Sequence, residues 1–233
     1  MDTRWYEDVN RFARSTAWAH GFMHAYALWL GVAVLGALLV GGWWVSRARG
    51  QAAVVGALWA AAGSALAVAV NQPVSHLVGR PRPYVTLHGV EVLVPRANDF
   101  TFPSDHATVA GAAICGLFLA GRKRLATAAA VAGLFLAFAR VYVGAHYPGD
   151  VVGGLVLGAV VIVVLRPVAR IILTPGVAWL ARSPLWFLVA TTRPVRQAPA
   201  EPAGQPVAVA GGTAAGGTAA GGTAAGPPGS PTA

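Results

Sequence analysis

Long apolar segments separated by short polar ones are the feature that most restricts how this chain can fold. Each segment is close to the roughly 20 residues that an α-helix needs to cross the hydrocarbon core of a bilayer. Because backbone amides in lipid must be hydrogen-bonded within their own segment, such stretches favour helices. We therefore expect an all-α, polytopic transmembrane helix bundle of five to six spans. The clear spans lie at about 24–44, 52–70, 103–120, 125–141 and 151–165.

The N-terminal residues differ from this pattern. Residues 1–21 place Trp5, Val9 and Phe12 at roughly helical spacing among polar residues. This spacing predicts an amphipathic helix that lies at the membrane interface. The predicted transmembrane domain then occupies residues 22–175.

The C-terminal part of the chain changes character twice. Residues 176–192 are apolar in part but interrupted by Arg182 and Pro184, so we expect either a short interfacial helix or a sixth span. Further on, the sequence GGTAA occurs three times in succession at 211–225. Such low-complexity composition cannot bury enough apolar surface to fold, which predicts a disordered tail at 193–233.

Charged residues are few and unevenly placed. The chain is 56% hydrophobic and 11% charged, with 17 basic against 8 acidic residues. On a soluble protein this positive charge would suggest nucleic acid, but here the arginines gather at the ends of the apolar segments, where topology accounts for them. We therefore expect membrane lipids, and no nucleic acid, as partners. The single Cys115 excludes a disulfide within the chain and a cysteine-rich zinc site.

The basic residues in the short loops predict the orientation. Arg47 and Arg49 follow the first apolar segment, residues 122–124 follow the third, and Arg166 and Arg170 follow the fifth. All three groups lie on one side, and basic residues in short loops favour the cytoplasm. The C-terminal tail is then cytoplasmic as well.

This orientation places the two remaining polar loops, 71–102 and 142–150, together on the outer side. They contain three stretches rich in ionisable residues. Ionisable residues at a membrane are costly and usually have a function or a partner. Each stretch is therefore a candidate for chemistry.

The first stretch is GRPRPY, residues 79–84. Its prolines hold Arg80 and Arg82 on a stiff, extended backbone. A period of two residues would direct both side chains to about the same side, where planar guanidinium groups suit bidentate contacts with phosphate. The same stretch is equally compatible with a proline-rich membrane loop whose arginines lie at the interface.

The second stretch is TFPSDHAT, residues 101–108. A proline just before an apolar run is typical of a helix start, so Ser104, Asp105 and His106 would occupy the first turn of the third span. Unpaired backbone N–H groups in that turn favour an anion, and His106 can exchange a proton near neutral pH. Alternatively, Ser104 and Asp105 only cap the helix.

The third stretch is ARVYVGAHYPGD, residues 139–150. Arg140 lies six residues before His146, Asp150 lies four after it, and Pro148 predicts that another span begins here. A carboxylate this close can keep one imidazole nitrogen protonated and leave the other as a nucleophile or base. The alternative is a structural His–Asp pair that caps the helix.

Taken together, the three stretches resemble, in order and spacing, the signature of the type 2 phosphatidic acid phosphatase family, which is related to vanadium haloperoxidases. FPSDHA and ARVYVGAHYPGD are similar above all to the bacitracin-resistance type of undecaprenyl pyrophosphate phosphatase. The resemblance covers roughly residues 10–165 and implies a multi-pass protein of the bacterial plasma membrane with an outward-facing site. The matching residues are Arg82-Pro83, Pro103-Ser104-Asp105-His106, Ala139-Arg140, His146 and Asp150.

The resemblance also implies catalytic roles. His146 would be the nucleophile that forms a phosphohistidine, and Asp150 would orient it. His106 would be the general acid that protonates the leaving oxygen and then helps water to attack. Members of this family work without a metal, so we expect no metal site and no cofactor.

The substrate-binding residues follow in the same way. Arg82, Ser104 and Arg140 match the family's phosphate clamp. Arg80 and Asp105 lie within the same motifs and are further candidates for contacts with the substrate.

Three positions depart from the family pattern. Ser75 stands where the family has a lysine, Asp105 replaces a glycine, and Ala139 replaces a serine. One positive contact with the phosphate is therefore missing, unless His76 or Arg80 supplies it.

The predicted function is an integral-membrane lipid phosphatase that hydrolyses undecaprenyl pyrophosphate to undecaprenyl phosphate and phosphate. Phosphatidic acid, phosphatidylglycerol phosphate and other prenyl phosphates are alternative substrates, because apolar surface recognises lipid tails without a short motif. A non-catalytic lipid-binding or transport protein is a further alternative, which the missing lysine favours. No oligomeric state follows from the sequence.

Overall fold

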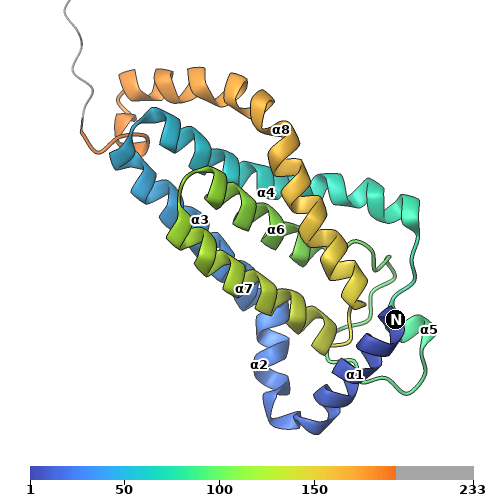
Figure 1. Cartoon of the computed structure of the whole chain (residues 1–233). Helices are drawn as coiled ribbons and strands as arrows, with labels where there is room; N and C mark the ends of the chain where they lie inside the picture. Colours follow the sequence, from blue (N-terminus) through green and yellow to red (C-terminus); the bar gives the residue numbers. More distant parts are fainter. Residues whose placement is uncertain (193–233) are drawn as a thin grey trace, which may run out of the picture. The chain divides into compact units, whose positions relative to one another are not determined.

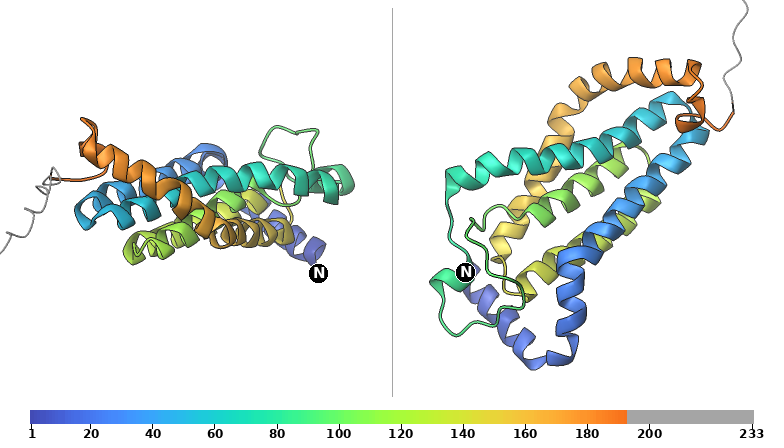
Figure 2. Two further views of the ribbon diagram at one scale, coloured as in Figure 1. Left: turned by 90° about the horizontal axis from the view of Figure 1, so that it is seen from above. Right: turned by 180° about the vertical axis from the view of Figure 1, so that it is seen from behind.

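A computed structural model describes residues 1–192 as an assembly of helices (Figures 1 and 2). The predicted tail at 193–233 lies outside the described residues. The predicted all-α fold class is confirmed. The helices are α1 (Asp2–Ser15), α2 (His20–Ala25), α3 (Gly31–Ser46), α4 (Gln51–Val78), α5 (Pro83–Thr86), α6 (Asp105–Leu119), α7 (Lys123–Tyr142) and α8 (Pro148–Arg182), with single 3-10 or π turns at Ala17–Ala19, Tyr26–Leu30, Arg47–Arg49 and Trp186–Leu188.

Five apolar helical segments account for the predicted spans. Four of them are long and apolar enough to cross a membrane, namely Ala17–Arg49, Gln51–Thr86, Lys123–Tyr142 and Pro148–Arg182. The fifth is α6, which has only 15 residues. It packs against α3, α4, α7 and α8 and lies among them in Figures 1 and 2. Its central place explains why eight of its residues are buried.

The outer surface of the helices is apolar. Val131, Val164 and Ile171 expose 68%, 63% and 76% of their surface. Water would disfavour so many exposed large apolar side chains, whereas the hydrocarbon core of a bilayer accepts them. This surface supports the membrane location that the apolar segments predict.

The last described helix differs from the sequence prediction. A separate helix was expected at 176–192, but α8 continues without interruption to Arg182, and between it and residue 192 there is only one 3-10 turn. Pro167 and Pro175 lie inside α8, and Figure 1 shows the helix changing direction in its second half. Prolines bend a helix without ending it when the freed backbone groups find other partners.

Glycines bring α6 and α8 into close contact. A Cβ atom on Gly111 would collide with the backbone of Leu155, and one on Gly154 would lie 2.6 Å from the carbonyl oxygen of Ser104. Small residues allow membrane helices to approach in this way. As a result, the Ser104 N–H at the start of α6 donates to the carbonyl of Asp150 in the first turn of α8, at 3.1 Å.

The helix predicted at 1–21 is present as α1, and it has two distinct faces. Tyr6, Asn10 and Ala13 are buried against the protein. Trp5 and Phe12 point away from it and are 60% and 51% exposed. An outward aromatic face is what a helix at the membrane interface needs, so that location stays a prediction that the side chains support.

The two polar loops meet at one end of the helices. The Leu93 N–H donates to the Val143 carbonyl at 3.0 Å, and the Thr101 N–H donates to the Arg80 carbonyl at 2.9 Å. The same end holds α1, α5 and the first turns of α6 and α8 (Figure 1). The three candidate stretches are thus gathered in one region.

Candidate active site

A polar pocket of about 250 Å³ lies at this end. It brings Arg82 from the first stretch together with His106 from the second, and with Arg140 and His146 from the third. The other lining residues are Asn71, Gln72, Ser75, His76, Asp99, Phe100, Pro103 and Asp105. Residues far apart in the chain therefore surround one volume.

The hydrogen bonds of His146 determine which ring nitrogen carries the proton. Nδ1 lies 2.8 Å from the carbonyl oxygen of Thr101, which can only accept. Nε2 lies 3.2 Å from Nη2 of Arg140, and a guanidinium can only donate. Nδ1 therefore holds the proton, and the lone pair of Nε2 accepts from Arg140, which lines the pocket together with His146.

Asp150 acts on His146 through Thr101 instead of binding it directly. Oδ2 of Asp150 is 4.0 Å from Nδ1 of His146, which is too long for a hydrogen bond. The Thr101 hydroxyl lies between them, donating to Oδ2 at 2.6 Å and lying 3.2 Å from Nδ1. The direct carboxylate–imidazole contact expected from the sequence is thus replaced by a three-residue arrangement.

Burial controls the charge of His146. The residue is only 3% exposed. Loss of hydration, followed by the positive charges of Arg140 and Arg82, holds the pKa of His146 well below its ordinary value. The ring is therefore neutral at physiological pH, as a nitrogen nucleophile must be.

The two pocket arginines are held in different ways. Arg82 donates two hydrogen bonds to the carboxylate of Asp99, at 2.6 and 2.8 Å, and a third to the carbonyl of Ala145 at 3.1 Å. The bonds from Arg82 in turn lower the pKa of Asp99. Arg140 is 6% exposed and forms no ion pair within residues 1–192. In that part of the chain no carboxylate touches Arg140, and Asp105 and Asp99 act on it only from a distance, so its guanidinium is available to an anion in the pocket.

Two buried polar atoms near the site have no protein partner among the described residues. They are Nε of Arg140 and Oγ of Ser104. Buried polar atoms are rarely left without a partner. Ser104 is the N-cap residue of α6, yet its hydroxyl makes no capping hydrogen bond. The capping alternative for Ser104 is therefore not what the structure has, although its side chain does not line the pocket itself.

Asp105 forms part of the wall of the pocket that His146 also lines. Its Oδ1 accepts hydrogen bonds from the side-chain amides of Asn71 and Gln72, both on α4. Amide donors keep the carboxylate in place next to a site that favours anions. Asp105 therefore lines the pocket, and its contact with the substrate stays a prediction.

An apolar groove of about 480 Å³ adjoins the polar pocket. Asp105 and His106 line both. The remaining lining residues of the groove are Leu28, Trp29, Val32, Ala33, Val68 and Val109. His106 thus stands between a volume suited to an anion and a volume suited to a hydrocarbon chain.

Arg80 does not reach the pocket. Its guanidinium pairs with Asp2 and Asp150, each at 2.7 Å. The prediction that Arg80 and Arg82 point to the same side assumed a period of two. The backbone of Arg82 has φ −69° and ψ 153°, close to polyproline II, whose period of three turns side chains two residues apart to different sides. Arg80 therefore cannot replace the missing lysine, whereas His76 and Ser75 both line the pocket.

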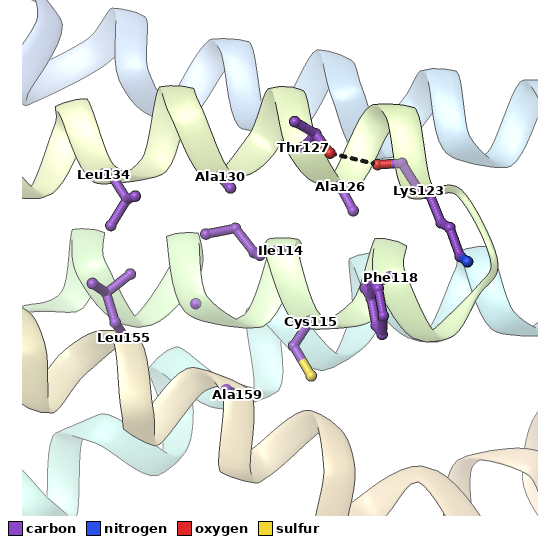
Figure 3. A pocket seen from close by; sticks show the side chains of 11 residues that line it. Ile114, Cys115, Phe118, Lys123, Ala126, Thr127, Ala130, Leu134, Leu155 and Ala159 are labelled. Atoms are coloured by element: carbon purple, nitrogen blue, oxygen red, sulfur yellow. Dashed lines mark hydrogen bonds between the residues drawn. The ribbon is translucent and has the colours of Figure 1, made fainter.

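A larger cavity of about 710 Å³ lies elsewhere, between α6, α7 and α8 (Figure 3). Its walls are mostly small or apolar residues such as Ala126, Ala130 and Leu155, and Lys123 and Thr127 supply its polar side chains. None of the predicted site residues lines it. Its Cys115 is a lone thiol with no histidine or carboxylate among the lining residues to activate it, so this cavity is not the candidate active site.

Sequence reasoning missed two residues of the site. Thr101 is the first residue of the second stretch, but a lone threonine gives no catalytic signal. Asp99 lies in the outer loop 17 residues after Arg82, and no local spacing pairs the two residues. Both lie in the irregular segment before α6, where periodicity predicts nothing.

Comparison with known proteins points to one family. Residues 56–171 match the family model described as the PAP2 superfamily. Undecaprenyl-diphosphatase BcrC of Bacillus subtilis is 38% identical over 92 residues, which is 40% of this chain and 47% of that protein. Decaprenylphosphoryl-5-phosphoribose phosphatase of Mycobacterium tuberculosis is 35% identical over 133 residues, covering 57% of this chain and 67% of that protein. The chain thus spans about half to two thirds of these relatives.

The fold has a counterpart among solved structures. The crystal structure of Aquifex aeolicus LpxE superposes with a TM-score of 0.55 at 20% identity, covering 71% of this chain and 94% of the other. At this identity, the likeness concerns the arrangement of helices.

Proposed function

Because this chain is a membrane protein that belongs to the PAP2 superfamily, we propose that it is a phosphatase of polyprenyl pyrophosphates or phosphates. Undecaprenyl pyrophosphate is the proposed substrate, and undecaprenyl phosphate and phosphate are the products. The proposed catalytic residues are His146, His106 and Asp150.

The adjoining pocket and groove are the observation that carries this proposal. A lipid pyrophosphate has a charged end and a long apolar end. The pocket offers Arg82 and Arg140, and the groove offers an apolar wall such as Leu28 and Val109. His106 lines both volumes, and the bond to be broken joins the terminal phosphate to the lipid part. A general acid at this boundary could reach the bridging oxygen.

The first proposed step transfers the phosphoryl group to the protein. The lone pair of His146 Nε2 attacks the terminal phosphorus and forms a P–N bond. The bond from phosphorus to the bridging oxygen breaks, and its electron pair leaves with the lipid phosphate, which receives a proton from His106. Arg82 and Arg140 stabilise the charge on the equatorial oxygens. The Thr101 carbonyl stabilises the Nδ1 proton as the ring becomes positive.

The second proposed step regenerates the enzyme. His106, now neutral, accepts a proton from water as the oxygen attacks phosphorus. The P–N bond breaks, its electron pair returns to Nε2, and phosphate is released. A covalent intermediate divides one difficult displacement into two easier ones.

A second candidate substrate is another polyprenyl phosphate. The M. tuberculosis relative named for decaprenylphosphoryl-5-phosphoribose aligns over a longer part of this chain than the B. subtilis undecaprenyl-diphosphatase does. The same pocket and groove would accept a monophosphate on a prenyl chain. The two substrates differ in their leaving group. A monophosphate would release an alcohol, which needs a proton from His106 more than a lipid phosphate does.

The proposal is tested by phosphate release from purified protein in detergent. We expect turnover of undecaprenyl pyrophosphate in the presence of EDTA, slower turnover of phosphatidic acid and phosphatidylglycerol phosphate, and no turnover by His146→Ala. Preference for phosphatidic acid would refute the substrate. Equal rates for His146→Ala and wild type would refute the site, and the absence of turnover on every lipid would favour a non-catalytic role.

We also propose that the site faces the outside of the cell membrane. The basic clusters at the opposite end of the helices support this orientation. In a Cys115→Ser background, cysteine at Val85, which is 64% exposed on α5, should react with an impermeant maleimide on intact cells. Cysteine at Arg124 should react only after permeabilisation, and the reverse pattern would refute the orientation.

A further inference from the structure

The first helix reaches the candidate site through a chain of ionic contacts. Oδ2 of Asp2 accepts from Nη2 of Arg80 at 2.7 Å, and Nη1 of Arg80 donates to Oδ1 of Asp150 at 2.7 Å. Oδ2 of Asp150 accepts from the Thr101 hydroxyl, which lies 3.2 Å from His146 Nδ1. Asp2 is therefore linked to the proposed nucleophile although it does not line the pocket.

Asp150 depends on Arg80 for its positive partner. The Asp150 side chain is fully buried, and a buried carboxylate is costly without a partner. Among residues 1–192, Arg80 is the only arginine or lysine in an ion pair with it. The cation that stabilises Asp150 is thus held by a residue outside the pocket.

Asp2 fixes the position of that cation. The Arg80 side chain is 31% exposed, so by itself it could turn toward solvent. Asp2 binds Nη2 of the guanidinium and leaves Nη1 for Asp150. The Asp2 carboxylate is itself anchored, because its Oδ1 accepts the Gly149 N–H at 2.8 Å, one residue before Asp150.

Aromatic and polar contacts hold Arg80 and α1 in this arrangement. The Arg80 guanidinium lies 4.1 Å above the ring of Tyr147, and that ring packs against Tyr6 of α1 at 5.4 Å. Further along α1, Asn10 exchanges two hydrogen bonds with the backbone of Glu91, at 2.8 and 3.0 Å. The helix is therefore docked in a defined position on the outer loops.

We propose that Asp2 and Arg80 are positioning residues for the reaction, so that α1 is a part of the active site and not only a membrane-surface helix. Asp2 orients Arg80, Arg80 orients Asp150, and Asp150 holds Thr101 and His146 in place for attack. This inference rests on the proposed function for its kinetic effects, but its structural effect on His146 can be observed without turnover.

A kinetic experiment separates positioning from simple stabilisation of the fold. Asp2→Ala should lower kcat about tenfold, because a small displacement of a reacting group costs this much or more. KM should stay within about twofold, because Asp2 does not touch the pocket. Rates are normalised to the amount of folded protein, which is measured by size exclusion and by the amplitude of the phosphoenzyme burst. The variant Asp2→Asn repeats the test with a side chain of the same size.

Two comparisons make the result specific. Asp8→Ala removes an acidic residue from the same helix, where Asp8 pairs with the exposed Arg11 at 3.3 Å, and it should leave kcat unchanged. If Asp2 acts through Arg80, then Asp2→Ala should have no further effect in an Arg80→Ala background. An Asp2→Ala protein with the kcat of Asp8→Ala, or with an equal loss in both backgrounds, would overturn the proposal.

An NMR measurement tests the same inference without turnover. In protein labelled with 15N-histidine, the Nδ1 proton of His146 should exchange slowly in wild type and in Asp8→Ala, and distinctly faster in Asp2→Ala. Unchanged exchange would refute the positioning role even if no lipid is hydrolysed. Absence of wild-type turnover together with faster exchange in Asp2→Ala would refute the proposed function while supporting this inference.

Discussion

Nη2 of Arg140 lies 3.2 Å from Nε2 of His146, so the proposed phosphate-binding cation and the proposed nucleophile face the same space. Both side chains are almost fully buried. A phosphoryl group that replaces this hydrogen bond would take the Arg140 donor for its oxygens and free the Nε2 lone pair for attack. The predictions below follow from this relationship and from the residues that hold it.

Replacing Arg140 should impair the chemistry more than the fold. Arg140→Lys keeps the charge but loses the planar guanidinium, whose paired N–H donors can hold two phosphate oxygens. We expect kcat/KM to fall on the order of 100-fold, the size typical for loss of one transition-state donor. Arg124→Lys, at the exposed opposite end, is the control and should match wild type. A fall of less than threefold for Arg140→Lys would contradict a direct role.

The side-chain hydroxyl of Thr101 should contribute to kcat independently of its backbone carbonyl. Thr101→Val keeps the shape and the carbonyl that accepts from His146, but it removes the donor to Asp150 and leaves that carboxylate short of one hydrogen bond. We expect kcat to fall about tenfold or more with little change in KM. Thr101→Ser keeps the hydroxyl and should retain most of the activity. Equal rates for the two variants would show that the hydroxyl is not needed.

His146 should become protonated only at a pH well below the one at which histidine ordinarily titrates. The pKa of His146 is lowered by burial and by Arg140. In protein labelled with 15N-histidine, its ring signals should therefore not titrate between about pH 7.5 and 5.5, where an ordinary histidine does. The unfolded chain binds this proton more readily, so stability should decrease as pH falls below about 6.5. A midpoint for His146 between about pH 6 and 7 would contradict the buried, neutral ring.

The sequence indicated the parts of this site better than their connections. Apolar segments of nearly bilayer length predicted the spans, and the short motifs predicted that His106, Arg140 and His146 share a pocket. Arg80 was misplaced because an extended proline-rich backbone was assumed to have a period of two. The contacts of Thr101 and Asp2 join segments about 50 to nearly 150 residues apart, and neither periodicity nor local spacing reports on such contacts. The end of α8 was missed because Pro184 and Arg182 suggested a separate element, whereas the helix accommodates its internal prolines.

The ion pair between Asp99 and Arg82 should stabilise the outer loop in a pH-dependent way. Arg82 lowers the pKa of Asp99, so the stabilisation is present above the unfolded pKa of about 3.9 and is lost as pH falls through the lower folded value. Asp99 is 58% exposed, and solvent screening limits the contribution to about 1 kcal/mol or less. Asp99→Asn should therefore melt slightly below wild type at neutral pH.

That difference in melting temperature should narrow below about pH 4. Asp8→Asn is the matched control, because its pair with Arg11 is exposed on both sides, and it should show no comparable change. A gap between Asp99→Asn and wild type that stays constant down to about pH 3 would contradict the ion-pair account.

The most direct test of the central claim is to detect an acid-sensitive phosphohistidine at residue 146. Purified protein is mixed with undecaprenyl pyrophosphate labelled with 32P in its terminal phosphate, quenched in base within milliseconds, and mapped by mass spectrometry. We predict label on His146 that disappears on a chase with unlabelled substrate and is absent from His146→Ala. Steady turnover with no label on His146 at any time, or with label on another residue that forms and decays at the turnover rate, would contradict the account.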